Sequence, residues 1–89
     1  MTEKQFIITD EAGIHARPAS ALVGALGKFK SDITMEYKGK TVNLKSILGV
    51  MSLGVSSGST VTIAANGEDE AQAIETISEV MATQGLSNQ

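Results

Sequence analysis

The chain of 89 residues has room for one small domain with one hydrophobic core, and we expect residues 1–89 to form that single domain. It has no cysteine and one histidine, which excludes disulfides, thiolate chemistry and a conventional zinc site, so we expect neither a metal nor a cofactor. The chain is poorly suited to bind nucleic acid, because it has seven basic against ten acidic residues and its aromatic residues are two Phe and one Tyr. Without a long apolar run, we expect no signal peptide, no membrane span and a cytoplasmic location.

The first two predicted elements are a strand and a helix. Apolar residues alternate over Gln5–Thr9, although Ile7 blurs the alternation and indicates partial cover of the strand's second face. A helix is predicted over Ala16–Gly27, in which Pro18 fits only the first turn. Its apolar residues recur at helical spacing: Ala19, Leu22, Val23 and Leu26. Gly24 costs about 1 kcal/mol there relative to alanine, which predicts close packing at that position.

A hairpin and a short helix follow. Asp32–Lys38 alternates apolar and polar residues, and Gly39 turns the chain into Lys40–Asn43, which predicts a hairpin with one face in solvent. Ser46 is a favourable N-cap and Gly54 a favourable stop. Together they predict a helix of about two turns between them.

The last part of the chain is predicted to form a strand and a longer helix. The strand ends at the Asn66–Gly67 turn and has three alternating apolar residues: Val61, Ile63 and Ala65. Glu68–Glu70 favours the positive start of the helix, and Gly85 ends it with a Schellman cap that returns Leu86 toward Met81. The order βαββαβα predicts the α+β class, as an open-faced β-sandwich with a four-stranded antiparallel sheet and three helices on one face.

The stretch Gly13–Ala19 (GIHARPA) places the single histidine, His15, at the start of the first helix. Free N–H groups of Ala16 and Arg17 and the helix dipole make an anion site there, to which the Arg17 guanidinium can contribute. The positive surroundings keep a lone pair on the imidazole, so His15 can attack phosphorus. The residues alone equally allow His15 as a simple cap and Arg17 as a solvated charge, and no spacing ties a carboxylate to His15.

The stretch Lys45–Gly54 (KSILGVMSLG) is more apolar than a short helix on a sheet can bury. We therefore predict an exposed patch for a partner, formed by Ile47, Leu48 and Met51. A short core helix is the alternative that the pattern leaves open. A phosphate on Ser46 would lie at a helix start and add nearly two negative charges beside the patch, although capping alone explains this serine equally well.

The two stretches together, in register, closely resemble HPr, the family of histidine-containing phosphocarriers of the bacterial phosphoenolpyruvate-dependent sugar phosphotransferase system. The similarity runs over essentially the whole chain. It implies the same open-faced fold, His15 as the residue that accepts the phosphoryl group on a ring nitrogen, and Arg17 as the residue that assists the phosphate. Enzyme I would be the donor and the IIA domains of sugar permeases the acceptors. The chain would be a monomeric carrier and not an enzyme.

The second stretch is similar to the Gram-positive version of the family. There, an ATP-dependent HPr kinase/phosphorylase modifies the serine at Ser46, which slows transfer through His15 and promotes binding to a catabolite-control transcription factor. The resemblance implies that Ile47 and Leu48 belong to a docking surface shared with residues of the first helix: Ala16, Ser20 and Val23. The chain departs from this version at Gly24 and Leu48, where a polar residue and a methionine are expected.

Two other function classes compete with the carrier. A regulatory binding module would act through phosphorylated Ser46, with His15 as a cap or sensor only. A small-ligand-binding domain would need a concave apolar pocket, for which the sequence pattern offers no evidence.

Overall fold

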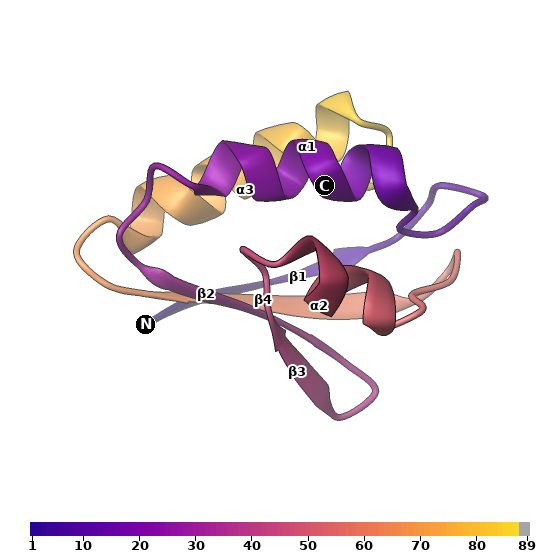
Figure 1. Cartoon of the computed structure of the whole chain (residues 1–89), viewed down its shortest axis with the longest axis horizontal. Helices are drawn as coiled ribbons and strands as arrows, with labels where there is room; N and C mark the ends of the chain where they lie inside the picture. Colours follow the sequence, from indigo (N-terminus) through magenta and orange to yellow (C-terminus); the bar gives the residue numbers. More distant parts are fainter. Residues whose placement is uncertain (88–89) are drawn as a thin grey trace.

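The computed structural model describes residues 1–87, which follow the predicted order βαββαβα. The elements are β1 (Thr2–Ile7), α1 (Ala16–Leu26), β2 (Asp32–Tyr37), β3 (Lys40–Asn43), α2 (Ile47–Ser52), β4 (Thr60–Asn66) and α3 (Glu70–Thr83). The strands form one antiparallel sheet in the order β1-β4-β2-β3. Figure 1 shows α1 and α3 lying side by side over one face of this sheet, and α2 contacts α1 and β3. The predicted α+β fold is confirmed.

The core lies between the sheet and the helices, because the period-two alternation of the strands turns their apolar side chains to one face. Strand and helix residues fill it together: Phe6, Ile33, Met35, Val61, Ile63, Leu22, Leu26, Ile77 and Met81. The opposite face of β1 is open, and the side chain of Ile7 is 45% exposed. The predicted cover of that second face is therefore wrong. None of the helices among the described residues has the length and apolar character needed to cross a membrane.

The first strand begins and ends earlier than predicted. It pairs with β4 from Thr2, opposite Ala65, to Ile7, opposite Thr60. The polar residues at its start carry no apolar alternation, and the hydrogen bonds of the β4 ladder hold them in the strand. The pattern over Gln5–Thr9 thus missed the start of β1 because long-range pairing decides it.

The predicted Schellman cap at the end of α3 is confirmed. Gly85 has φ +71, and its N–H donates to the Ala82 carbonyl at 3.2 Å. The Leu86 N–H donates to the Met81 carbonyl at 2.9 Å, which completes the motif. The side chains of Leu86 and Met81 are both fully buried, so the cap also closes this end of the core.

The acidic residues before α3 fasten its start to two other segments. Asp69 makes no capping hydrogen bond to its own helix; its carboxylate accepts from the Ser31 hydroxyl and from the N–H groups of Lys30 and Ser31. These bonds, that of the Ser31 hydroxyl first, hold the pKa of Asp69 below its usual value. Glu70 accepts from the Thr2 hydroxyl at 2.5 Å, which lowers the pKa of Glu70. Asp69 and Glu70 thus link the start of α3 to the segment between α1 and β2 and to β1.

Candidate functional site

The loop before α1 is held in one conformation by backbone contacts. Gly13 has φ +68, and a Cβ at this position would clash with the Val55 carbonyl oxygen, so only glycine fits. The Gly13 N–H donates to the Asp10 carbonyl at 2.9 Å, and the Ile14 N–H donates to the Val55 carbonyl at 3.2 Å. The chain therefore reaches His15 in a fixed position. His15 has extended backbone (φ -104, ψ 179) and immediately precedes the first helical residue.

The side chain of His15 contacts a carboxylate. Its Nε2 lies 3.3 Å from Oδ2 of Asp10, and it makes no capping hydrogen bond to α1. The expectation that no carboxylate is tied to His15 is wrong, and so is the alternative in which the imidazole caps the helix. The His15 side chain is 43% exposed and that of Asp10 22%, so this pair lies at the surface.

Asp10 is oriented by its own turn. The N–H of Ala12 donates to Oδ1 of Asp10 at 2.9 Å, which leaves Oδ2 facing the imidazole. The Ala12 N–H, and to a lesser degree His15, hold the pKa of Asp10 below its usual value, so its carboxylate is ionised at neutral pH. The sequence signal for this arrangement is an aspartate near the start of a loop that ends in glycine. An Asp side chain in such a loop often accepts a hydrogen bond from the backbone N–H two residues later, which is an Asx turn.

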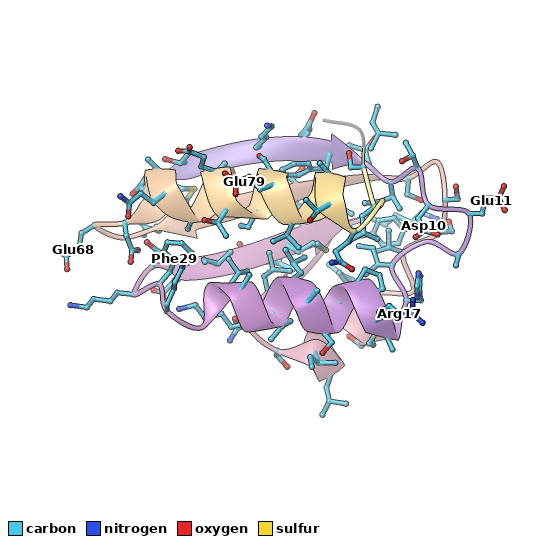
Figure 2. All side chains as sticks on the ribbon, turned by 90° about the horizontal axis from the view of Figure 1, so that it is seen from above. Asp10, Glu11, Arg17, Phe29, Glu68 and Glu79 are labelled. Carbon is cyan, nitrogen blue, oxygen red and sulfur yellow. The ribbon has the colours of Figure 1, made fainter. Side chains whose placement is uncertain are left out.

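The start of α1 presents hydrogen-bond donors to solvent. The Ala19 N–H donates to the His15 carbonyl at 3.1 Å, whereas the N–H groups of Ala16 and Arg17 have no acceptor among residues 1–87. The Arg17 side chain is exposed, and no hydrogen bond or ion pair joins it to another described residue. Figure 2 shows Arg17 at the same end of the molecule as Asp10. The start of α1 therefore carries an imidazole, a guanidinium and two N–H groups, each of which can interact with an anion.

Other site chemistry has little support in the structure. Among residues 1–87, no group of three or more His, Asp or Glu side chains could hold a metal ion. A hollow of about 510 Å³ lies between the end of α1 and α3, and its lining is mostly charged or polar: Lys28, Phe29, Asp69, Gln72, Glu75, Thr76 and Glu79. It lies at the end of α1 opposite His15 and is not the apolar pocket that a small-ligand domain needs.

The short helix exposes its apolar residues as predicted. The exposed fractions are 41% for Ile47, 84% for Leu48 and 38% for Met51, whereas Val50 is 1% exposed and packs into the core. The alternative of a wholly buried helix is therefore wrong. The Ser46 hydroxyl accepts from the Gly49 N–H at 3.1 Å, which confirms the predicted N-cap.

The neighbouring helix α1 contributes less apolar surface. Ala16 and Ser20 are exposed and Val23 is half-buried. Gly24 is exposed too, and a Cβ there would meet nothing within 4 Å, so the predicted close packing is wrong. Six of the exposed or half-buried residues of the two helices form the surface that the sequence predicts to bind partners, and we call this surface the docking patch: Ala16, Ser20, Val23, Ile47, Leu48 and Met51.

Contacts at both ends hold α2 antiparallel to α1. The Lys45 ammonium, before α2, donates to the Phe29 carbonyl, beyond α1, at 2.6 Å. The N–H of Ile14, before α1, donates to the Val55 carbonyl, beyond α2. Figure 1 shows the same arrangement, with the two helices running in opposite directions. Ser46 therefore lies toward the end of α1 and away from His15.

Comparison with known proteins agrees with this geometry. The family model described as "PTS HPr component phosphorylation site" matches residues 2–83. The chain belongs to the HPr family. This family provides the non-catalytic phosphocarrier component of the phosphotransferase system. The resemblance that the two sequence stretches indicate is therefore confirmed.

Three solved structures show what this family member resembles. A histidine-containing phosphocarrier protein from Mycoplasma is 42% identical, with a TM-score of 0.96 over 99% of this chain and 100% of that chain. A phosphocarrier protein HPr from Bacillus anthracis is 39% identical, with a TM-score of 0.82 over 89% of this chain and 94% of that chain. Crh, a catabolite-repression protein from Bacillus subtilis described as a domain-swapped dimer, is 40% identical, with a TM-score of 0.73 over 97% of this chain and 98% of that chain.

Proposed function

We propose that this family member carries a phosphoryl group on His15, receiving it from phospho-enzyme I and passing it to the sugar-specific IIA domains. The observation that carries the proposal is the position of the half-exposed imidazole at the start of α1, beside N–H groups and an Arg17 side chain that have no partner among residues 1–87. A doubly charged phosphoryl group on the ring would be stabilised by these donors and by the helix dipole.

The contact with Asp10 favours one ring nitrogen as the nucleophile. An ionised carboxylate only accepts hydrogen bonds, so Nε2 carries the proton that points at Oδ2. The lone pair then resides on Nδ1. In the proposed reaction, this pair attacks phosphorus and a P–N bond forms, while the bond between phosphorus and the donor breaks and its electron pair leaves with the donor.

The few donors around His15 suit a carrier that must also release its cargo. One exposed arginine and two backbone N–H groups give modest stabilisation of the bound phosphoryl group. A site with many converging donors would bind the phosphate tightly and slow its onward transfer. The proposed carrier works in the cytoplasm as a monomer, although the Crh structure is a dimer.

A regulatory function through Ser46 has its own support in the similarity to Crh, the catabolite-repression protein. Ser46 starts a helix beside the docking patch, where a phosphate would change the charge of that surface. An HPr kinase/phosphorylase would add this phosphate, and a catabolite-control transcription factor would bind the product. If phosphorylation of Ser46 regulates the carrier, this function is compatible with phosphoryl transfer through His15. If regulation is the only function of the protein, His15 carries no phosphoryl group.

The test is to incubate the protein with enzyme I and labelled phosphoenolpyruvate and to examine the stability of the bound label. We expect an acid-labile, base-stable label, typical of phosphohistidine, that is lost in His15→Ala and kept in the matched control Ser46→Ala. A label that survives in His15→Ala contradicts the proposal. An unlabelled wild-type protein would favour the purely regulatory function.

A further inference from the structure

We propose that Asp10 is a positioning residue for phosphoryl transfer, which holds the Nε2 proton of His15 while the phosphoryl group is on Nδ1. This inference rests on the proposed carrier function. The two oxygens of Asp10 have separate partners: Oδ1 accepts from the Ala12 N–H at 2.9 Å, and Oδ2 lies 3.3 Å from Nε2. The turn thus fixes the carboxylate, and the carboxylate orients the ring.

The proton on Nε2 decides what leaves when the phosphoryl group moves on. Attack by Nδ1 gives a phosphorylated ring that keeps its Nε2–H and carries a positive charge. In onward transfer, the acceptor's nucleophile bonds to phosphorus, the P–Nδ1 bond breaks, and its electron pair returns to Nδ1. With the proton in place the leaving group is neutral imidazole, whereas without it the leaving group is the much poorer imidazolate anion. A carboxylate beside Nε2 opposes loss of this proton.

Among residues 1–87, the segments around His15 carry few charged side chains besides Asp10. Glu11 lies on the same loop, and Figure 2 shows its side chain projecting outward, away from the molecule. Arg17 is the charged residue of the first turn of α1. Residues 51–59 and 84–87 contain no charged side chain. Ser59, the last residue of the first segment, is hydrogen-bonded to Tyr37, and its hydroxyl lowers the pKa of Tyr37 to about 8.

Asp10→Asn removes the charge and retains an oxygen for the Ala12 N–H, so the turn is preserved. Glu11→Gln is the matched control, because it makes the same charge change on the same loop. Both variants and wild type are phosphorylated with enzyme I and phosphoenolpyruvate. Nitrogen-15 NMR of the ring then follows the protonation of Nε2 with pH, and the pH profile of onward transfer is recorded beside it.

Because the carboxylate lies beside Nε2, we expect the phosphorylated ring to keep this proton less well in Asp10→Asn than in wild type, and equally well in Glu11→Gln. Where the proton is lost, onward transfer slows by about threefold in Asp10→Asn relative to wild type, and an unchanged melting temperature shows that the fold is intact. The change of the transfer rate with pH must come from His15 and not from Tyr37. This change should therefore remain in Tyr37→Phe.

The possible failures are distinct. If Asp10→Asn deprotonates at the wild-type pH, or if Glu11→Gln shifts equally, the role of Asp10 is wrong and the carrier function stands. If wild type forms no phosphohistidine, the proposed function and this role are both overturned. In the unphosphorylated proteins, loss of the preference for the Nε2–H tautomer in Asp10→Asn supports the contact, and an unchanged tautomer contradicts it.

Discussion

Leu48 and Val50 lie two residues apart in α2 and have opposite surroundings, with exposed fractions of 84% and 1%. This contrast tests whether the docking patch binds partners or serves the fold. Leu48→Ala removes little buried area from the free protein, so its stability should change by less than about 0.5 kcal/mol. Burial of a leucine side chain against a partner contributes about 1.5 to 3 kcal/mol, so the Kd for enzyme I should rise by about tenfold or more.

Val50→Ala should show the reverse. It removes two buried methyl groups, each worth about 0.8 kcal/mol, and leaves a small cavity, for a total of about 2 kcal/mol. In a domain of this size, the melting temperature should fall by about 8 to 16 °C. Enzyme I affinity should stay near the wild-type value at temperatures where the variant is folded, because Val50 offers almost no surface to a partner.

Calorimetric titration with enzyme I and thermal denaturation of the three proteins measure both effects. If Leu48→Ala binds enzyme I as tightly as wild type does, the patch on α2 is not the docking surface. If Leu48→Ala lowers the melting temperature as much as Val50→Ala does, Leu48 packs against the protein and its exposed position is wrong.

Two further predictions concern charge. Ser46→Asp should raise the Kd for enzyme I by about tenfold, because docking must desolvate the new charge. The melting temperature should stay unchanged, because aspartate also caps a helix, whereas unfolding would show that the start of α2 is core. The folded-state pKa values of Asp69 and Glu70 lie below their usual values of 3.8 and 4.5. Their contribution to stability is therefore complete above these values and lost as the pH falls through the folded pKa values. The melting temperature should then drop below about pH 4.5, and less steeply in Asp69→Asn than in wild type. An equal drop in the two proteins would refute this role of Asp69.

Features decided by neighbouring residues could be predicted from the sequence. The Schellman cap needs only a glycine and a hydrophobe after an amphipathic stretch, and Gly85 with Leu86 supplies them. The exposed side of α2 follows from an excess of apolar residues over what six helical residues can bury, and Ser46 is recognisable as a cap.

Features decided by long-range contacts could not be predicted in this way. The polar start of β1 is a strand only because β4 pairs with it. Asp69 resembles a helix cap in the sequence, yet its carboxylate bonds to Ser31, a residue 38 positions away. The position of Gly24 along the predicted helix does not show whether it faces a neighbouring element or solvent, so its exposure could not be predicted. The Asp10–His15 contact depends on a turn whose closure requires Gly13 to lie against the backbone of Val55.

The antiparallel arrangement of α1 and α2 separates the two proposed phosphorylation sites while both remain beside one docking patch. His15 lies at the end where Ile14 bonds to Val55, and Ser46 lies at the end where Lys45 bonds to Phe29. A phosphate on Ser46 is thus placed to act on a partner that covers the patch, at the end of α1 away from the imidazole. In the proposed function, modification of Ser46 changes which partners dock, and Asp10 sets how readily the phosphoryl group leaves His15.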